Sequence, residues 1–96
     1  MKKLKEGDLV RQISSESGIT MITTKRVLNS LKDVIIDNLR NGNQVHLIGF
    51  GLFEPFIRHE RKGVDLSRSF NPITLPKIRI AKFRTGYKMK RMLKKD

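Results

Sequence analysis

The chain has 96 residues, of which 38% are hydrophobic and 31% charged; this suits one small folded domain and excludes a disordered chain. It contains no cysteine, which excludes a disulfide framework, a thiolate nucleophile and a Cys-ligated zinc site. The net charge of +12 favours a polyanionic partner, above all nucleic acid, and most of the excess lies in residues 54–96, with thirteen Lys and Arg against four Asp and Glu.

The first part of the chain predicts two helices. A short helix is indicated by three apolar residues at helical spacing, Leu9, Val10 and Ile13, with Asp8 as its N-cap and Gly18 as its end. Thr20 offers the N-cap of a longer helix. Its apolar stripe recurs at i, i+3, i+4 and i+7 and consists of Val27, Leu28, Leu31, Val34, Ile35 and Leu39. Asn41-Gly42-Asn43 predicts the end of this helix and a turn.

A β-ribbon is predicted next. Residues 44–53 read as a strand, interrupted at Gly49-Phe50-Gly51 by a tight turn or bulge whose two glycines can adopt positive φ. The ribbon continues over residues 56–62 and returns over residues 77–83, where basic and apolar residues alternate with period two. We therefore expect one cationic and one apolar face. Residues 63–76 have the composition of a turn and predict the far end of a protruding two-stranded arm.

The chain closes with a short basic helix, for which Thr85 is the expected cap, and which carries Tyr87, Met89, Met92 and Leu93 on one side. The predicted fold class is α+β in one domain: a helical body over residues 1–43, a β-ribbon and arm over 44–84, and a C-terminal helix over 85–96. Because so short a chain cannot cover both its apolar ribbon and its second helix, we expect a dimer.

Two segments of the chain resemble the bacterial histone-like HU and integration host factor family. Val45-His46-Leu47-Ile48-Gly49-Phe50-Gly51-Leu52-Phe53 is similar to the family's G-F-G-x-F strand turn, and it follows the expected helix pair. Phe83-Arg84-Thr85-Gly86, followed by a basic helix, resembles the family's F-x-x-G-K segment. The resemblance covers nearly the whole chain and needs about one inserted residue between these landmarks.

The resemblance implies an intertwined dimer whose body buries Phe50, Phe53 and Phe83, and two arms that wrap around double-stranded DNA in the minor groove. It implies an architectural protein that binds DNA largely independently of sequence and bends or compacts it, as part of the cytoplasmic nucleoid. A homodimer is expected, with a heterodimer with a paralogue left open. The residues expected to bind DNA are Arg58, Arg61, Lys62, Arg68, Lys77, Arg79, Lys82 and Arg84 on the arm, and Lys88 and Lys90 on the closing helix.

The tip of the arm departs from the R-N-P pattern of the family. A gapless alignment from Arg61-Lys62-Gly63 places Leu66 on the third of these positions, which makes Leu66 the expected wedge between base pairs. Asn71-Pro72 carries the literal N-P dipeptide several residues later, so Pro72 is the alternative wedge. Asp65 beside the tip would repel phosphate, and Tyr87 stands where the family usually has lysine.

Two other functions stay open. Gly18-Ile19-Thr20 between two helices also resembles a helix-turn-helix, in which the second helix reads the major groove, although that helix is nearly balanced in charge. An RNA-binding or ribosome-associated protein would have the same positive charge, although aromatic residues that could stack on bases are few.

An enzyme is not expected. His46 lies in an apolar strand and His59 in the basic ribbon, and the sequence has no phosphate-binding loop, nucleophile elbow or metal-ligand spacing. We therefore expect no cofactor, no metal and no small-molecule substrate. No stretch approaches the ~18 apolar residues of a membrane span, so no membrane partner is expected and the cytoplasm is the expected location.

Overall fold

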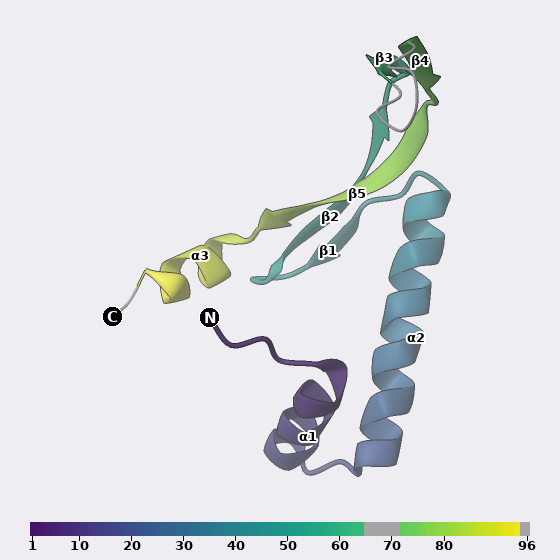
Figure 1. The fold of residues 1–96 in the computed structure, drawn as a ribbon. Helices are drawn as coiled ribbons and strands as arrows, with labels where there is room; N and C mark the ends of the chain where they lie inside the picture. The colour runs from purple at the N-terminus through teal and green to yellow at the C-terminus, as the bar shows by residue number, and fades with distance from the viewer. Residues whose placement is uncertain (65–71, 95–96) are drawn as a thin grey trace. The chain divides into compact units, whose positions relative to one another are not determined.

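The computed structural model describes residues 1–64 and 72–94. It divides into two compact units, Met1–Ile36 and Asp37–Asp96. The described elements are three helices and five strands (Figure 1): α1 (Glu6–Ser17), α2 (Met21–Arg40), β1 (Val45–Leu47), β2 (Gly51–Arg58), β3 (Arg61–Val64), β4 (Pro72–Leu75), β5 (Ile78–Thr85) and α3 (Tyr87–Leu93). The predicted α+β class is confirmed.

Both helices of the first unit end where the sequence predicts, but α1 begins earlier. Lys5 is its N-cap and Asp8 lies in the first turn, where the carboxylate Oδ2 accepts a hydrogen bond from Lys5 N at 3.0 Å. The prediction that Asp8 is the N-cap is therefore wrong, because the same acidic side chain satisfies the helix terminus from three positions inside it. Gly18 ends α1 with φ of 76°, and Thr20 Oγ1 accepts from Thr23 N at 3.3 Å, as an N-cap does.

One ion pair joins α1 to α2 within this unit. Lys32 Nζ lies 2.6 Å from Glu6 Oε1. The hydrogen bond and charge of Lys32 lower the pKa of Glu6 below its usual value. A lowered carboxyl pKa contributes stability that is present above the unfolded-state pKa and lost as the pH falls through the folded-state pKa. Because both groups are exposed, the contribution of this pair is small.

The turn after α2 is formed as predicted. Gly42 adopts φ of 83°. Three backbone N–H groups of this turn donate to carbonyls in the last turn of α2: Asn41 to Asp37 at 3.1 Å, Gly42 to Leu39 at 3.1 Å and Asn43 to Asn38 at 2.9 Å. Three of the last four carbonyls of the helix therefore have partners in this turn, and that of Arg40 is left for another donor.

The strands of the second unit form a three-stranded antiparallel sheet in the order β1-β2-β5. The two glycines of the turn between β1 and β2 serve different purposes. Gly49 adopts φ of 78°, whereas Gly51 is buried in the sheet without positive φ. A Cβ at Gly51 would lie 2.4 Å from Phe83 Cζ and 2.6 Å from the carbonyl oxygen of Arg84. The prediction that both glycines supply positive φ is thus wrong for Gly51, which is required by packing.

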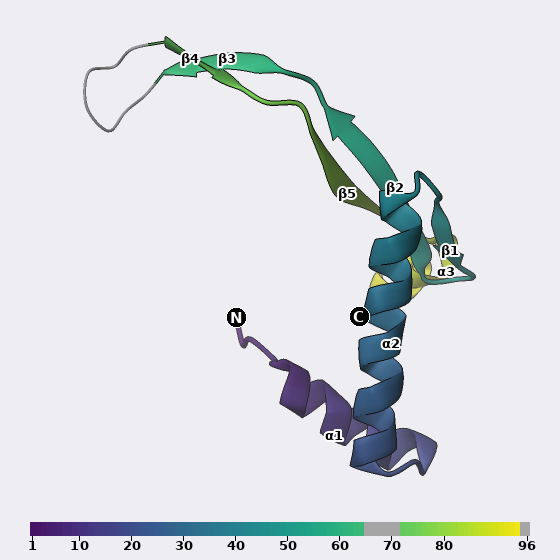
Figure 2. The same cartoon turned by 90° about the vertical axis from the view of Figure 1, so that its right-hand side faces the viewer.

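The arm is a longer ribbon than the sequence indicated. β3 pairs with β4 as far as Val64↔Pro72, so the prediction that residues 63–76 are all turn is wrong. Arg58↔Ile78 and Arg61↔Leu75 are three residues apart on both strands, which places β2–β5 and β3–β4 in one register without a bulge. Figure 2 shows β3 and β4 continuing the ribbon beyond β2 and β5.

α3 is attached to the turn between β1 and β2. Thr85 belongs to β5 and Gly86 is the N-cap, so the prediction of a Thr85 cap is wrong. The N–H groups of Gly86 and Met89 donate to the carbonyls of Phe50 at 2.8 Å and Gly49 at 3.0 Å. These bonds satisfy donors at the start of α3 that no helical carbonyl can reach. They also explain why the G-F-G and F-x-x-G segments occur together in one chain.

A single chain covers little of its apolar surface. Among the described apolar residues, only Val10 and Leu39 are buried. The three phenylalanines expected in the core do lie together: the ring of Phe83 is 5.6 Å from that of Phe50 and 4.9 Å from that of Phe53. However, Phe50 and Phe83 remain 46% and 41% exposed. The aromatic cluster is therefore assembled but open on one side.

Candidate nucleic-acid interface

The strand register assigns the side chains of the arm to two faces, because directly opposed residues share a face and successive residues alternate. The Phe83 face consists of Phe53, Pro55, Ile57, Arg79, Ala81 and Phe83. The Lys82 face consists of Leu52, Glu54, Phe56, Arg58, Ile78, Ile80, Lys82 and Arg84, and it continues into β3 at Lys62.

Cations lie on both of these faces, so the prediction of one cationic and one apolar face is wrong. Arg79 is on the Phe83 face, whereas Lys82 and Arg84 are on the Lys82 face. The cause is the pair Ile80-Ala81, which puts two apolar residues in succession and shifts the phase of the alternation by one. The base of the Phe83 face is apolar and packs its phenylalanines, while the Lys82 face carries exposed cations along the ribbon.

The cations near the base of the Lys82 face have neighbours that orient them. Glu54 Oε2 lies 3.7 Å from Arg84 Nε, and Glu54 Oε1 accepts from Gln44 Nε2 at 3.5 Å. Lys82 Nζ lies 5.5 Å from the centroid of the Phe56 ring. The side chain of Arg84 is still 66% exposed, so its ion pair is weak and its guanidinium can reach a phosphate.

The remaining arm residues are placed as follows. Arg58 is half-buried, and Lys62 and Lys77 are exposed. Arg61 pairs with Leu75 in the ladder, and Pro72 begins β4 opposite Val64. Leu66 and Arg68 lie outside the described residues. Arg79 differs from the other cations, because its guanidinium Nη1 donates to the backbone carbonyl of Arg40.

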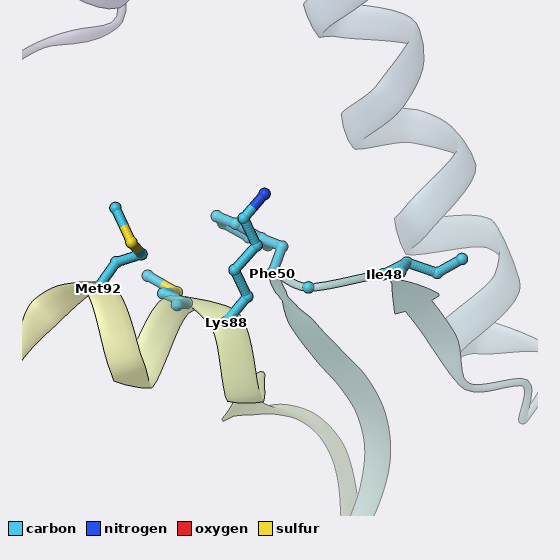
Figure 3. Close-up of a pocket in the computed structure, with 6 residues that line it drawn as sticks. Ile48, Phe50, Lys88 and Met92 are labelled. Carbon is cyan, nitrogen blue, oxygen red and sulfur yellow. The ribbon is translucent and has the colours of Figure 1, made fainter.

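The closing helix adds a second group of exposed cations, Lys88 and Lys90. Figure 3 shows Lys88 and Met92 of α3 beside Phe50, around an open hollow of about 290 Å³. Sequence reasoning missed Arg91, whose guanidinium carbon lies 5.5 Å from the centroid of the Tyr87 ring. The i, i+4 spacing of these two residues was the available signal. The exposed ring of Tyr87 thus holds a cation near the position where the family usually has lysine.

Residues suited to other chemistry do not gather in the described part of the chain. Over residues 1–64 and 72–94, no three His, Cys, Asp or Glu side chains lie close enough to hold a metal ion. His46 and His59 are both exposed. None of the described helices combines the length and apolar character needed to cross a bilayer.

Comparison with known proteins identifies the family. The family described as "Bacterial DNA-binding protein" matches residues 4–94. The chain belongs to this family, which includes HU and integration host factor. The DNA-binding protein HU of Thermotoga maritima is 30% identical over 87 residues, covering 91% of this chain and 96% of that protein. HU of Thermus thermophilus is 31% identical over 94 residues, covering 98% and 96%.

A solved HU structure supports the assignment. The cocrystal structure of Anabaena HU with DNA has a TM-score of 0.88 at 25% identity and covers 97% of this chain and 100% of that chain. The resemblance to the HU family drawn from the G-F-G and F-x-x-G segments is therefore confirmed. Neither the helix-turn-helix nor the RNA-binding alternative receives support from these matches.

Proposed function

We propose that this chain binds double-stranded DNA in the minor groove, largely independently of sequence, and bends or compacts it. The observation that carries the proposal is the narrow two-stranded arm with cations on both of its faces. A ribbon inside a groove has a phosphate backbone on either side, so cations that leave it in two directions can reach both backbones. The displaced counterions supply much of the binding free energy and give no sequence readout.

The functional unit that we propose is a dimer. The half-exposed Phe50 and Phe83 and the exposed apolar residues of α2 exceed what a stable single chain leaves in water. A second copy of the chain would cover them, and a heterodimer with a paralogue would do the same. A bacterial DNA-binding protein of this kind would be part of the nucleoid in the cytoplasm. Its role would be architectural and not enzymatic, in line with its family.

Competition binding of the full-length protein tests this function. We expect duplex DNA to be bound in preference to single-stranded DNA and RNA of the same length, with still tighter binding to nicked or bulged duplex, in which less unstacking free energy is needed for bending. Measurement at two salt concentrations separates the counterion contribution. Equal or tighter binding to RNA would contradict the proposal.

A second prediction concerns the wedge. Leu66→Ala should reduce DNA bending and leave the slope of log K against log salt unchanged, because an apolar side chain acts by entering an opened base step and releases no counterion. Energy transfer between dyes at the two ends of a short duplex reports the bend. The preference for nicked DNA should also fall, because such DNA is already partly unstacked.

Pro72→Ala is the matched variant, since Pro72 is the alternative wedge and begins β4 opposite Val64. We expect it to bend DNA like the parent protein. A straightened duplex with Pro72→Ala and an unchanged one with Leu66→Ala would assign the wedge to Pro72. An unchanged bend with both variants would show that the arms coat DNA without intercalating.

A further inference from the structure

The end of α2 is bonded to the arm through the side chain of Arg79. Its Nη1 donates to the backbone carbonyl of Arg40, the last residue of the helix. The other three terminal carbonyls of α2 already accept N–H groups of the turn Asn41-Gly42-Asn43. Arg79 therefore satisfies the one carbonyl that this turn leaves over, and a guanidinium there is also favoured by the negative end of the helix dipole.

The face on which Arg79 lies agrees with this role. Arg79, Ala81 and Phe83 alternate along the same face of β5, and Phe83 belongs to the aromatic cluster. The cations Arg58, Lys82 and Arg84 lie on the opposite face of the ribbon. A cation on the cluster side, already bonded to main chain, is poorly placed for a phosphate that the Lys82 face binds.

We propose that Arg79 is a positioning residue, which holds the base of the arm against the carboxyl end of α2 and does not bind phosphate. This inference rests on the proposed function, since it assigns DNA contact to the Lys82 face. It also changes the expectation for Arg79, which the sequence grouped with the DNA-binding cations. A fixed arm base lowers the entropic cost of ordering the ribbon when DNA binds.

The test compares Arg79→Ala with Arg58→Ala in the full-length protein. Arg79→Ala should weaken duplex binding roughly fivefold at every salt concentration, as loss of one intramolecular hydrogen bond would, with an unchanged salt slope. Backbone amide exchange in β5 and in residues 41–43 should become faster. Arg58→Ala should instead lower the salt slope by about 0.9 and leave amide exchange as it was. Arg79→Lys, which keeps a donor of similar reach, should restore slow exchange in part.

A salt slope lowered by about 0.9 in Arg79→Ala, with unchanged amide exchange, would overturn the proposal and make Arg79 a phosphate contact. Unchanged affinity, slope and exchange would overturn it as well. If Arg79→Ala does not fold, Arg79→Met keeps the apolar stem and allows the same comparison. If Arg58→Ala leaves the slope unchanged, the proposed DNA contact of the Lys82 face fails, while amide exchange still decides the role of Arg79.

Discussion

Replacing Arg58, Lys62 and Lys82 by alanine is expected to weaken binding to all duplex sequences alike and to lower the salt slope by about 2.7, at about 0.9 for each lost phosphate contact. All three residues lie on the Lys82 face. Between about 50 and about 200 mM salt, the parent protein should then lose about 40-fold more affinity than the variant. Fluorescence anisotropy with two unrelated duplexes over this range measures both effects.

The control removes the same formal charge from α2, with Lys25, Arg26 and Lys32 replaced by alanine. We expect a much smaller change in slope, because these residues lie on the helical body and Lys32 is already paired with Glu6. If the α2 variant lost binding and the arm variant did not, α2 would be the DNA-binding element and the protein would act as a helix-turn-helix.

Phe83→Ala should lower the free energy of unfolding by about 3–5 kcal/mol, as truncation of a core aromatic does. The ring of Phe83 contacts both Phe50 and Phe53, so its loss opens the whole cluster. Phe56→Ala is the matched control. Phe56 lies on the Lys82 face and is 46% exposed, and its removal should cost about 1 kcal/mol or less. Urea unfolding followed by circular dichroism measures the difference.

The same experiment tests the dimer. For a folded dimer, the urea midpoint should rise with protein concentration, because the unfolded chains are separate. Phe83→Ala should show this dependence at a lower midpoint. A well-folded monomer of 11.1 kDa by light scattering at micromolar concentration would contradict the dimer, and equal costs for Phe83→Ala and Phe56→Ala would show that the core is misplaced.

Local signals in the sequence were sufficient for most elements of the fold. The apolar stripe of α2 and its Thr20 cap need only contacts within one helix, so periodicity finds them. Gly49 and Gly42 mark turns because positive φ is a property of single residues. Asp8 was misplaced because an acidic residue favours the whole first turn of a helix, and composition alone does not distinguish its positions.

Other features depend on residues far apart in the chain. Gly51 is needed because Phe83 and Arg84 of another strand leave no room for a Cβ, which no local pattern announces. The bond from Arg79 to Arg40 spans 39 residues. The distribution of cations over two faces was in principle readable from the successive apolar residues Ile80 and Ala81, but the limits of the arm strands were not, since Gly, Pro and Asn favour turns whether or not the strands pair.

The shared register of β2–β5 and β3–β4 also restricts how an arm of this kind can change in length. Inserting one residue into a single strand would move every side chain beyond it to the opposite face, unless a bulge absorbed the extra residue. Two residues added to each strand would instead lengthen the arm by about 6.6 Å and leave Arg58 and Lys82 facing as they do now. Insertions of paired dipeptides between the Arg58↔Ile78 and Arg61↔Leu75 pairs should therefore give proteins that span more of a DNA groove from an unaltered body.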